Sequence, residues 1–278
     1  MKTAVIDTGG GLRGIYGAGV FDFCLENKIS FSHCIGVSAG SANAASFLAG
    51  QKGRNFRFYT EYAKRREYMS SFNFLKTHSY LNLDYIYGTL SNSAGEDPLD
   101  CETLLKNPSD YTVVATDAKT GEPKYFTKDD ISTDNYAILK ASCCIPAINQ
   151  AYTIGDRQYY DGGVGDAIPI DYALKNGAEK IVLILTRPVD SDISFNKERL
   201  CAALLRSDFP NTSKALLERE KKYRDAIKEA DALRREGKLL IVAPSDIGNL
   251  KTLSKDTREL SKLYIQGKTD AEKILHFI

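Results

Sequence analysis

Short apolar runs alternate with glycine-rich turns over residues 1–50. Residues 2–7 (KTAVID) and 31–37 (FSHCIGV) predict two buried strands, whereas residues 15–28 and 38–50 predict helices, the second of which ends at glycine. Such βαβα units form parallel strands joined by right-handed crossovers, so the carboxyl ends of both strands lie at one edge of the sheet. We therefore expect the loop after the first strand to lie beside the turn after the second.

The pattern is weaker between residues 51 and 105, where aromatic residues are frequent, and we expect helical insertions around a site. Residues 111–126 predict two strands around a KTGE turn, and residues 135–148 predict a helix that ends near Pro146. Residues 151–166 predict a hairpin with a Gly-Asp turn, followed by glycines.

The remaining chain returns to alternating helices and strands. Residues 170–188 predict a helix and a buried strand, and residues 213–238 predict a charged helix before a short strand and two closing helices. No repeat or low-complexity linker divides the sequence. We predict one α/β domain over residues 1–278, with the core motifs in 1–190 and a helical and strand extension in 191–278.

Composition limits the classes of function. Lysine plus arginine (37) balance aspartate plus glutamate (36), which argues against nucleic acid as a partner. No run approaches the about 18 apolar residues of a membrane span, and the start of the chain lacks the apolar region of a signal peptide. We expect a cytoplasmic protein without a transmembrane span, and peripheral contact with a membrane stays open.

The six cysteines show no C-x-x-C spacing and lie mostly in apolar runs. This pattern favours reduced thiols in the core over disulfides or zinc ligands. We expect no metal site.

Ser38 lies in the G-x-S-x-G pattern GVSAG, between Gly36 and Gly40. The pattern falls at a predicted strand-to-helix turn, where small neighbours permit the sharp bend that exposes a nucleophilic hydroxyl. The amino terminus of the following helix would favour developing negative charge. The alternative is a small residue that packs the helix on the sheet.

The second motif is GGGLRG, residues 9–14, which also satisfies the G-x-G-x-x-G pattern of dinucleotide-binding sites. Those sites need an acidic residue at the end of the second strand, where this chain has GVSAG. Backbone amides of a glycine loop beside Ser38 would instead form an oxyanion hole, typically worth about 3 to 4 kcal/mol of barrier. Arg13 could orient the loop, attract an anionic head group, or form a surface salt bridge.

None of the three histidines is well placed to take a proton from Ser38. His33 lies on the strand before the turn, His78 lies in the weakly patterned insertion, and His276 lies near the carboxyl end, where fraying is common.

A carboxylate is the alternative base. Asp161 precedes two glycines in YYDGGVGD, where the backbone can turn tightly, although an Asp-Gly-Gly sequence can also be a simple turn. Asp166 and Asp117 are weaker candidates, and we expect Asp7 to brace the glycine loop. Partial desolvation would raise the proton affinity of the aspartate, and such a site should favour esters over amides.

Three motifs therefore follow one another along the chain: GGGLRG, GVSAG and DGG. Together they resemble those of the patatin-like phospholipases, serine lipid acyl hydrolases with a Ser-Asp dyad in place of a triad. The resemblance extends over roughly the first 190 residues, through GIYGAGVFDFCLENK, ATDAKTGEPKYF, ASCCIPAI and GGVGDAIPIDYAL, and the joint occurrence is far more specific than one motif.

By this resemblance Ser38 matches the nucleophile and Asp161 matches the base of the dyad. The oxyanion loop and the family's arginine position correspond to Gly9, Gly10, Gly11 and Arg13. The remaining motif glycines are Gly14, Gly36, Gly40, Gly162 and Gly163. Thr8 stands where many relatives have an acidic residue, but the donors of the loop are backbone groups.

The resemblance implies a parallel-rich sheet between helices and two-step cleavage of a lipid or other ester through an acyl-enzyme, with no metal or organic cofactor. The cationic and aromatic residues 50–69 suit an interfacial surface, although an ordinary helix with a solvated basic face is the alternative. A catalytically silent lipid-binding or regulatory protein on the same fold is the second hypothesis. A dinucleotide-dependent enzyme is the third, and the missing ribose acid disfavours it.

Overall fold

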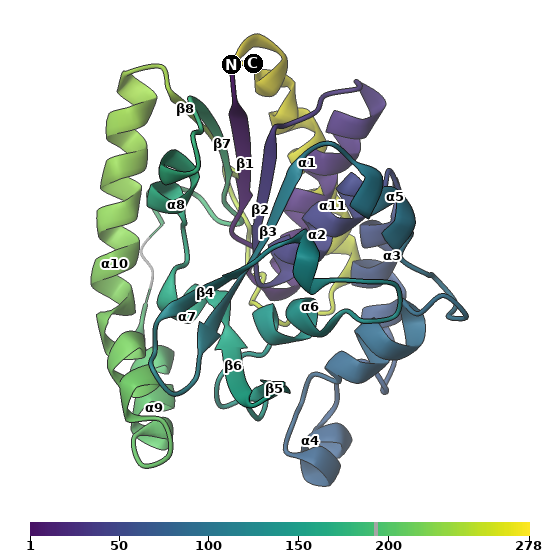
Figure 1. Cartoon of the computed structure of the whole chain (residues 1–278), viewed down its shortest axis with the longest axis vertical. Helices are drawn as coiled ribbons and strands as arrows, with labels where there is room; N and C mark the ends of the chain where they lie inside the picture. The colour runs from purple at the N-terminus through teal and green to yellow at the C-terminus, as the bar shows by residue number, and fades with distance from the viewer. Residues whose placement is uncertain (192–193) are drawn as a thin grey trace.

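The computed structural model describes residues 1–191 and 194–278. Its centre is an eight-stranded sheet with the order β5-β6-β3-β2-β1-β7-β8, in which β4 pairs with β3 (Figure 1). The strands are β1 (Thr3–Asp7), β2 (His33–Val37), β3 (Asp110–Asp117), β4 (Pro123–Phe126), β5 (Tyr152–Ile154), β6 (Arg157–Asp161), β7 (Lys180–Ile184) and β8 (Leu239–Val242).

The middle of the sheet is parallel. β1 pairs in parallel with β2 and β7, β2 pairs in parallel with β3, and β7 pairs in parallel with β8. β4, β5 and β6 form the antiparallel part beside β3. The predicted class, a parallel-rich sheet between helices, is confirmed. β1, β2 and β7 therefore end at one edge, which we call the carboxyl edge.

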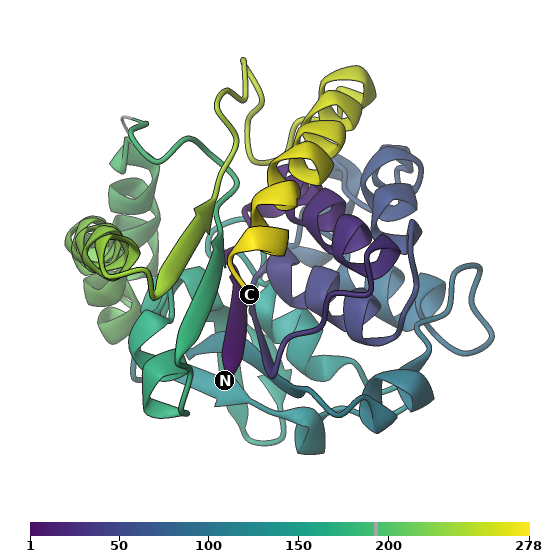
Figure 2. The same ribbon diagram turned by 90° about the horizontal axis from the view of Figure 1, so that it is seen from above.

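Helices cover both faces of the sheet, as Figure 2 shows. One face carries α1 (Ile15–Glu26), α2 (Ala39–Leu48), α3 (Arg54–Thr60) and α11 (Thr257–Asp270), and the other carries α8 (Ile170–Lys175), α9 (Asn196–Leu205) and α10 (Pro210–Arg235). Successive side chains of a strand point to opposite faces. On β1, Val5 joins the apolar cluster that contains Tyr16 of α1, whereas Ile6 joins the cluster that contains Ala230 of α10.

The segment between α3 and β3 is helical, as predicted. It contains the 3-10 turn η2 (Tyr62–Lys64), α4 (Ser71–Thr77), the π-helix η3 (Tyr85–Leu90) and α5 (Cys101–Lys106). The short helix α7 (Gly162–Gly165) lies at the predicted glycine turn after the hairpin. The 3-10 turn η4 (Lys128–Asp130) lies between β4 and α6, in a stretch for which the sequence predicts no element. The helix predicted over 135–148 is shorter than expected: α6 (Ala137–Ser142) ends before the Cys143–Cys144 pair, well ahead of Pro146.

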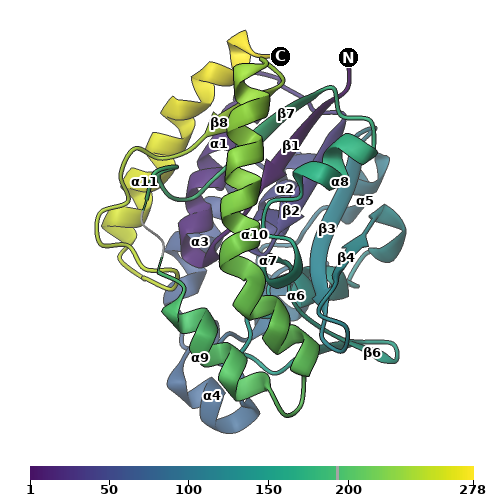
Figure 3. The same ribbon diagram turned by 90° about the vertical axis from the view of Figure 1, so that its left-hand side faces the viewer.

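The carboxyl-terminal segment is part of both helical layers and of the sheet. α10 would extend about 39 Å at the usual rise per residue, and it runs along one face in Figure 3. α11 packs so closely on α1 that a Cβ atom at Gly19 would lie 2.2 Å from the carbonyl oxygen of Tyr264. The chain ends in the 3-10 turn η5 (Ala271–His276), beside the amino terminus (Figure 1).

None of the helices in the described ranges combines the length and apolar character needed to cross a membrane. The six cysteines are free thiols, and five of them are buried, as the sequence predicts. Within residues 1–191 and 194–278, no three histidine, cysteine, aspartate or glutamate side chains gather as metal ligands would.

Candidate active site

Ser38 occupies a strained turn between β2 and α2. Its backbone angles are φ 56° and ψ −132°, a conformation that a residue with a Cβ atom rarely adopts. Such strain costs about 1 to 3 kcal/mol and persists only where surrounding contacts hold it. The predicted strand-to-helix elbow is therefore present, and the hydroxyl group lies at the carboxyl edge.

Hydrogen bonds on both sides hold this turn. The Ser38 amide donates to Oγ of Ser142 at 2.9 Å, and the Ser38 carbonyl accepts from Oγ of Ser41 at 2.6 Å. Ser142 in turn donates to the carbonyl oxygen of Val114 on β3 at 2.6 Å. No sequence motif indicates this role of Ser142, although the residue lies in the ASCCIPAI segment.

Close packing of the backbone requires glycine at the two motif positions on either side of Ser38. A Cβ atom at Gly36 would lie 2.3 Å from Cα of Ser41, and one at Gly40 would lie 2.2 Å from the carbonyl oxygen of Asp7. Backbone occupies both positions, so no side-chain movement could relieve either contact. β1, β2 and α2 can approach this closely only with glycine at these two sites.

The glycine loop rests directly on the Ser38 turn. Gly9, Gly10 and Gly11 have φ values of 63°, 117° and 62°, a succession of positive angles that glycine alone adopts without strain. A Cβ atom at Gly9 would lie 2.3 Å from the carbonyl oxygen of Val37. The loop and the elbow are therefore side by side, as the parallel strands predict, and Gly14 continues the close packing with the Tyr59 hydroxyl against it.

The amides of the loop differ in their partners. Gly9 donates to Oδ1 of Asp7 at 2.9 Å, so its amide is already occupied. For Gly10 and Gly11 the described part of the chain offers the amides no acceptor. Gly11 also lines the same cavity as Ser38. These two amides are the ones available to an oxyanion beside Ser38.

Asp7 braces the loop, as expected. Besides the Gly9 amide, its carboxylate accepts from Nδ2 of Asn43 at 2.8 Å. Complete burial raises the pKa of Asp7 to about 6, although these two hydrogen bonds oppose the shift.

Asp161 lies at the end of β6, against the same turn. Its carboxylate accepts from the Gly163 amide at 2.8 Å, and the Ser38 side chain lies close enough to lower its pKa. Burial raises the pKa of Asp161, while the nearby Ser38 side chain, the Gly163 hydrogen bond and the charge of Arg219 lower it. Gly162 allows the turn to pass β3, because a Cβ atom there would lie 2.1 Å from the Val114 carbonyl oxygen.

Arg219 of α10 reaches this turn from the carboxyl-terminal segment. Its Nε donates to the Gly163 carbonyl at 2.5 Å, and its Nη1 lies 2.6 Å from Oε1 of Glu198 on α9. The sequence around Arg219 gives no sign of this contact, because its pattern is that of a charged, solvated helix. Arg219 therefore couples α9 and α10 to the loop that carries Asp161.

Arg13 lies in the 3-10 turn η1 (Gly11–Gly14), but not on the surface. The side chain is 8% exposed, and it makes no ion pair with any acidic residue of the described ranges. Its Nε has no hydrogen-bond partner. Burial, followed by the charge of Arg187, lowers the pKa of Arg13 to about 10. The alternative of a surface salt bridge is wrong.

The histidines lie away from Ser38. His33 begins β2, so its backbone lies about 16 Å from Ser38 at the usual strand rise, and its Nε2 lies 2.8 Å from Oγ1 of Thr112. His78 is exposed at the end of α4. His276 lies at the amino edge of the sheet, where the neighbouring Phe277 carbonyl accepts from Lys180 at the start of β7.

The weaker carboxylate candidates also have other partners. Asp166 accepts from the Tyr125 hydroxyl at 2.7 Å. Asp117 accepts from the amides of Lys119 and Thr120 within the KTGE turn. Asp161 is thus the candidate base that the fold brings to Ser38.

An apolar cavity opens beside Ser38 on the α3 face. Its walls come from the glycine loop, α2, α3, the insertion and the segment after α6. The lining residues are Gly11, Leu12, Ser38, Ala39, Ala42, Arg54, Asn55, Phe58, Tyr59, Tyr68, Leu81, Leu83, Ile86, Tyr87, Cys143, Ile145 and Leu253. This lining suits a hydrocarbon chain.

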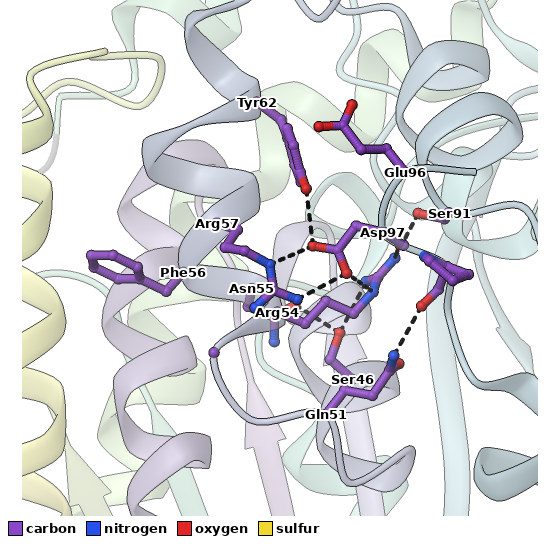
Figure 4. A network of polar contacts seen from close by, with 12 residues as sticks. Ser46, Gln51, Arg54, Asn55, Phe56, Arg57, Tyr62, Ser91, Glu96 and Asp97 are labelled. Atoms are coloured by element: carbon purple, nitrogen blue, oxygen red, sulfur yellow. Dashed lines mark hydrogen bonds and ion pairs between the residues drawn. The ribbon is translucent and has the colours of Figure 1, made fainter.

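A buried ionic network supports one wall of this cavity (Figure 4). The carboxylate of Asp97 accepts from Nε of Arg57 at 2.6 Å and from the Tyr62 hydroxyl at 3.2 Å. Nε of Arg54 lies 3.6 Å from the same carboxylate. The network fixes α3 to the loop that follows the π-helix.

Arg54 belongs to both the network and the cavity wall. It donates to Oγ of Ser91 at 2.8 Å and to Oγ of Ser46 at 3.1 Å, and it lies over the Phe58 ring at 4.4 Å. Burial lowers the pKa of Arg54 to about 10. Because its polar partners lie behind the wall, the guanidinium supports the cavity without making its interior polar.

Comparison with known proteins identifies relatives of the chain. A family model described as patatin-like phospholipase matches residues 8–174, which is more than half of the chain, and a domain of unknown function matches residues 209–278. The uncharacterized protein YjjU of Escherichia coli (strain K12) is 28% identical over 193 residues, which are 67% of this chain and 52% of that protein. The chain thus spans about half the length of this curated relative.

Among solved structures, VipD from Legionella pneumophila has a similar fold. The TM-score is 0.51 at 16% sequence identity, and the match covers 99% of this chain and 66% of that one. At this identity the likeness concerns the fold alone.

Proposed function

This chain belongs to the patatin-like phospholipase family, and we propose that it is a serine acyl hydrolase that cleaves fatty acyl esters with Ser38 as nucleophile and Asp161 as base. The observation that carries the proposal is the convergence of the Ser38 turn and the buried Asp161 carboxylate: a Cβ atom built on Gly163 would lie 3.1 Å from Oδ1 of Asp161 and 4.0 Å from Cγ1 of Val37, the residue before Ser38. Ser38 and Asp161 come from distant parts of the chain, and the site leaves each only 8% exposed.

The first step forms an acyl-enzyme. Asp161 takes the hydroxyl proton while Oγ of Ser38 attacks the ester carbonyl carbon, and the carbonyl oxygen becomes an oxyanion. The amides of Gly10 and Gly11 stabilise this charge, and one such donor is typically worth about 3 kcal/mol. The tetrahedral intermediate then collapses, the alcohol leaves with the proton from Asp161, and the acyl group stays on Ser38.

The second step releases the fatty acid. Water enters the place of the alcohol and loses a proton to Asp161 as it attacks the acyl carbon. Collapse of the second tetrahedral intermediate returns that proton to Oγ of Ser38. The same carboxylate therefore acts first as base and then as acid in each half of the reaction.

The apolar cavity is the proposed site for the acyl chain. It begins at Ser38 and is lined by side chains such as Phe58, Leu83 and Ile86. A bound acyl chain would therefore be removed from water along its whole length. Each methylene group that is buried contributes about 0.8 kcal/mol to binding, which would favour acyl chains long enough to fill the cavity. This preference supports a lipid ester over a small ester as substrate.

We propose that contact with a membrane occurs at α4 rather than along the whole basic segment 50–69. In that segment Arg57 is bound to Asp97, and Arg65 is bound to Glu96 at 2.6 Å. Short helix α4, by contrast, buries none of its residues, and three of its apolar side chains are exposed: Phe72, Phe74 and Leu75. Exposed apolar side chains on a helix suit insertion at the boundary of a lipid surface.

α4 also lies next to the cavity. The segment that contains α4 begins after Met69 and ends before Leu81, and a β-bridge joins these two residues. Tyr68 and Leu81, at the two ends of this segment, line the cavity. A lipid surface at α4 would therefore lie near the proposed acyl site.

The test compares the parent with Ser38→Ala, Asp161→Asn and His276→Ala on a short-chain p-nitrophenyl ester and on phospholipid in mixed micelles. The first two changes should lower kcat by about a thousandfold or more, whereas His276→Ala should retain parental activity. Circular dichroism and thermal unfolding check that each variant folds.

Labelling of Ser38 by a fluorophosphonate, located by mass spectrometry, gives a second readout. Inactivation by His276→Ala would indicate a triad and contradict the dyad. A parent that neither hydrolyses esters nor reacts with the probe would favour the lipid-binding or regulatory hypothesis.

A further inference from the structure

Three arginine side chains lie near one another at the carboxyl edge of the sheet, where their charges act on one another and on Tyr223 of α10. Arg13 follows the glycine loop, Arg187 follows β7, and Arg219 comes from α10. Thr186, which precedes Arg187, donates to the Gly9 carbonyl at 2.5 Å, so the end of β7 touches the glycine loop. Tyr223 lies one helical turn after Arg219, and the charges of all three arginines act on its hydroxyl group.

Two of the guanidinium groups border the two glycine turns that flank Ser38. A Cβ atom built on Gly10 would lie 3.6 Å from Nη2 of Arg13. One built on Gly163 would lie 3.5 Å from Nη2 of Arg219. The arginine cluster is thus continuous with the candidate active site.

Positive charge exceeds negative charge in this cluster. Arg219 has Glu198 as its partner, and this carboxylate also acts on Arg187. Arg13 is more than nine-tenths buried, and its Nε has no hydrogen-bond partner. The charges of Arg187 and Arg219 both disfavour protonated Arg13, in addition to its burial.

A buried cation without a partner is costly, because desolvation is not offset by a counter-charge. An anion among the three side chains would supply that charge and accept the unused hydrogen bonds. A phosphate group fits this chemistry well, since its several oxygens can accept from more than one planar guanidinium fork at once.

We propose that Arg13, Arg187 and Arg219 form a binding site for a phosphate group, which is supplied either by a lipid head group or by free phosphate. α10, which contributes Arg219, and α3, which lines the apolar cavity, lie on opposite faces of the sheet (Figure 2). A phosphate-bearing ester at Ser38 would then extend its acyl chain toward one face and its phosphate toward the other. This orientation rests on the proposed function, whereas the binding site itself does not.

Calorimetric titration of the Ser38→Ala protein with inorganic phosphate tests the site without ester turnover. Sodium chloride at matched ionic strength is the reference. We expect saturable binding of phosphate, weakened about tenfold by Arg187→Gln and less by Arg187→Lys, as for the loss of one charge-assisted hydrogen bond. The matched control is Arg235→Gln, which removes an exposed arginine of α10 and should bind as the parent does.

A competition experiment distinguishes the two sources of phosphate. Displacement of bound phosphate by dihexanoyl phosphatidylcholine below its micelle concentration, but not by dihexanoylglycerol, would assign the site to a lipid head group. Saturable phosphate binding without such displacement would assign it to free phosphate. No binding beyond the chloride reference, or equal binding by parent and Arg187→Gln, would overturn the proposal even if the parent hydrolyses esters.

Discussion

Ser142 joins the backbone of Ser38 to the central sheet: its Oγ accepts from the Ser38 amide at 2.9 Å and donates to the Val114 carbonyl at 2.6 Å. Ser142 is fully buried, so water cannot replace either contact. One hydroxyl group therefore satisfies the amide of a strained residue and fixes that residue to β3. The Ser142 hydroxyl group is thus one of the contacts that hold Ser38 in its strained backbone conformation.

Ser142→Ala should lower both stability and turnover. The Ser38 amide and the Val114 carbonyl would lose their partner, which typically costs about 1 to 3 kcal/mol. Because the change loosens the turn without altering the cavity lining, we expect kcat to fall about tenfold or more with little change in KM. Urea unfolding and steady-state ester hydrolysis measure the two effects.

Ser213→Ala is the matched control. Ser213 is also buried, and its Oγ donates to the Ala202 carbonyl at 2.7 Å, within the α9 and α10 layer. It should lose stability but retain kcat. If both variants lose turnover in proportion to stability, Ser142 has no special role in holding the nucleophile.

Activity should depend on pH through Asp161. The carboxylate must be ionised to take the Ser38 proton, and burial raises its pKa above the ordinary value of 3.8. kcat/KM on a neutral ester should therefore rise as pH increases through the raised pKa and level off above it. The charge of Arg219 opposes the rise in the pKa, so Arg219→Gln should move the acid limb to higher pH.

Arg219→Lys separates charge from hydrogen bonding. It keeps the positive charge but loses the fork that binds Gly163 and Glu198, so its acid limb should stay near the parent's while its plateau falls. A pH–rate series of parent, both variants and Arg235→Gln makes the comparison. A lower plateau for Arg219→Gln without movement of the limb would contradict an electrostatic effect on Asp161.

Local patterns were sufficient to predict much of this molecule. The opening βαβα unit follows from apolar runs and glycine stops, and parallel pairing then places the glycine loop against the Ser38 turn. The hairpin before Asp161 follows from its Gly-Asp turn. In each case the local structure depends on the backbone conformation of a few consecutive residues, and their sequence determines that conformation directly.

Contacts between distant segments could not be predicted in this way. Arg219 lies 56 residues from Gly163, in a helix whose charged pattern predicts only solvent contact. The sequence predicts a longer helix around Ser142, and nothing in the neighbouring residues indicates that its hydroxyl group contacts the Ser38 backbone. Arg13 likewise lies near Arg187, Arg219 and Tyr223, which are more than 170 residues away in the chain, so the residues around GGGLRG do not predict its surroundings.

The ionic network behind the cavity predicts that loss of the Asp97 carboxylate alone lowers the stability of the fold strongly. Asp97→Ala would leave Arg54, which is 4% exposed, and the more exposed Arg57 without their counter-charge. Removing one partner of a buried ion pair typically costs about 3 to 5 kcal/mol, and the hydroxyl partners of Arg54 suggest the lower end. Urea unfolding checks the loss.

Glu96→Ala tests whether the burial of the Asp97 ion pairs is the cause of this loss of stability. Glu96 is the next residue in the chain and binds Arg65 in an exposed pair, which water can replace. Its removal should change stability little. Equal losses for the two variants would show that local backbone perturbation, rather than the buried charge, dominates.

The exposed side chains of α4 predict a specific loss of membrane binding. Leu75 is 80% exposed, and Arg66 lies over the neighbouring Phe72 ring at 4.5 Å, so apolar and cationic groups occur together. Leu75→Asp should reduce sedimentation with phosphatidylglycerol-containing vesicles, because a carboxylate must then approach an anionic lipid surface. Hydrolysis of a soluble ester should stay unchanged. Ile265→Asp, which alters an equally apolar exposed side chain on α11, is the control, and an equal decrease for both variants would argue against α4 as the contact.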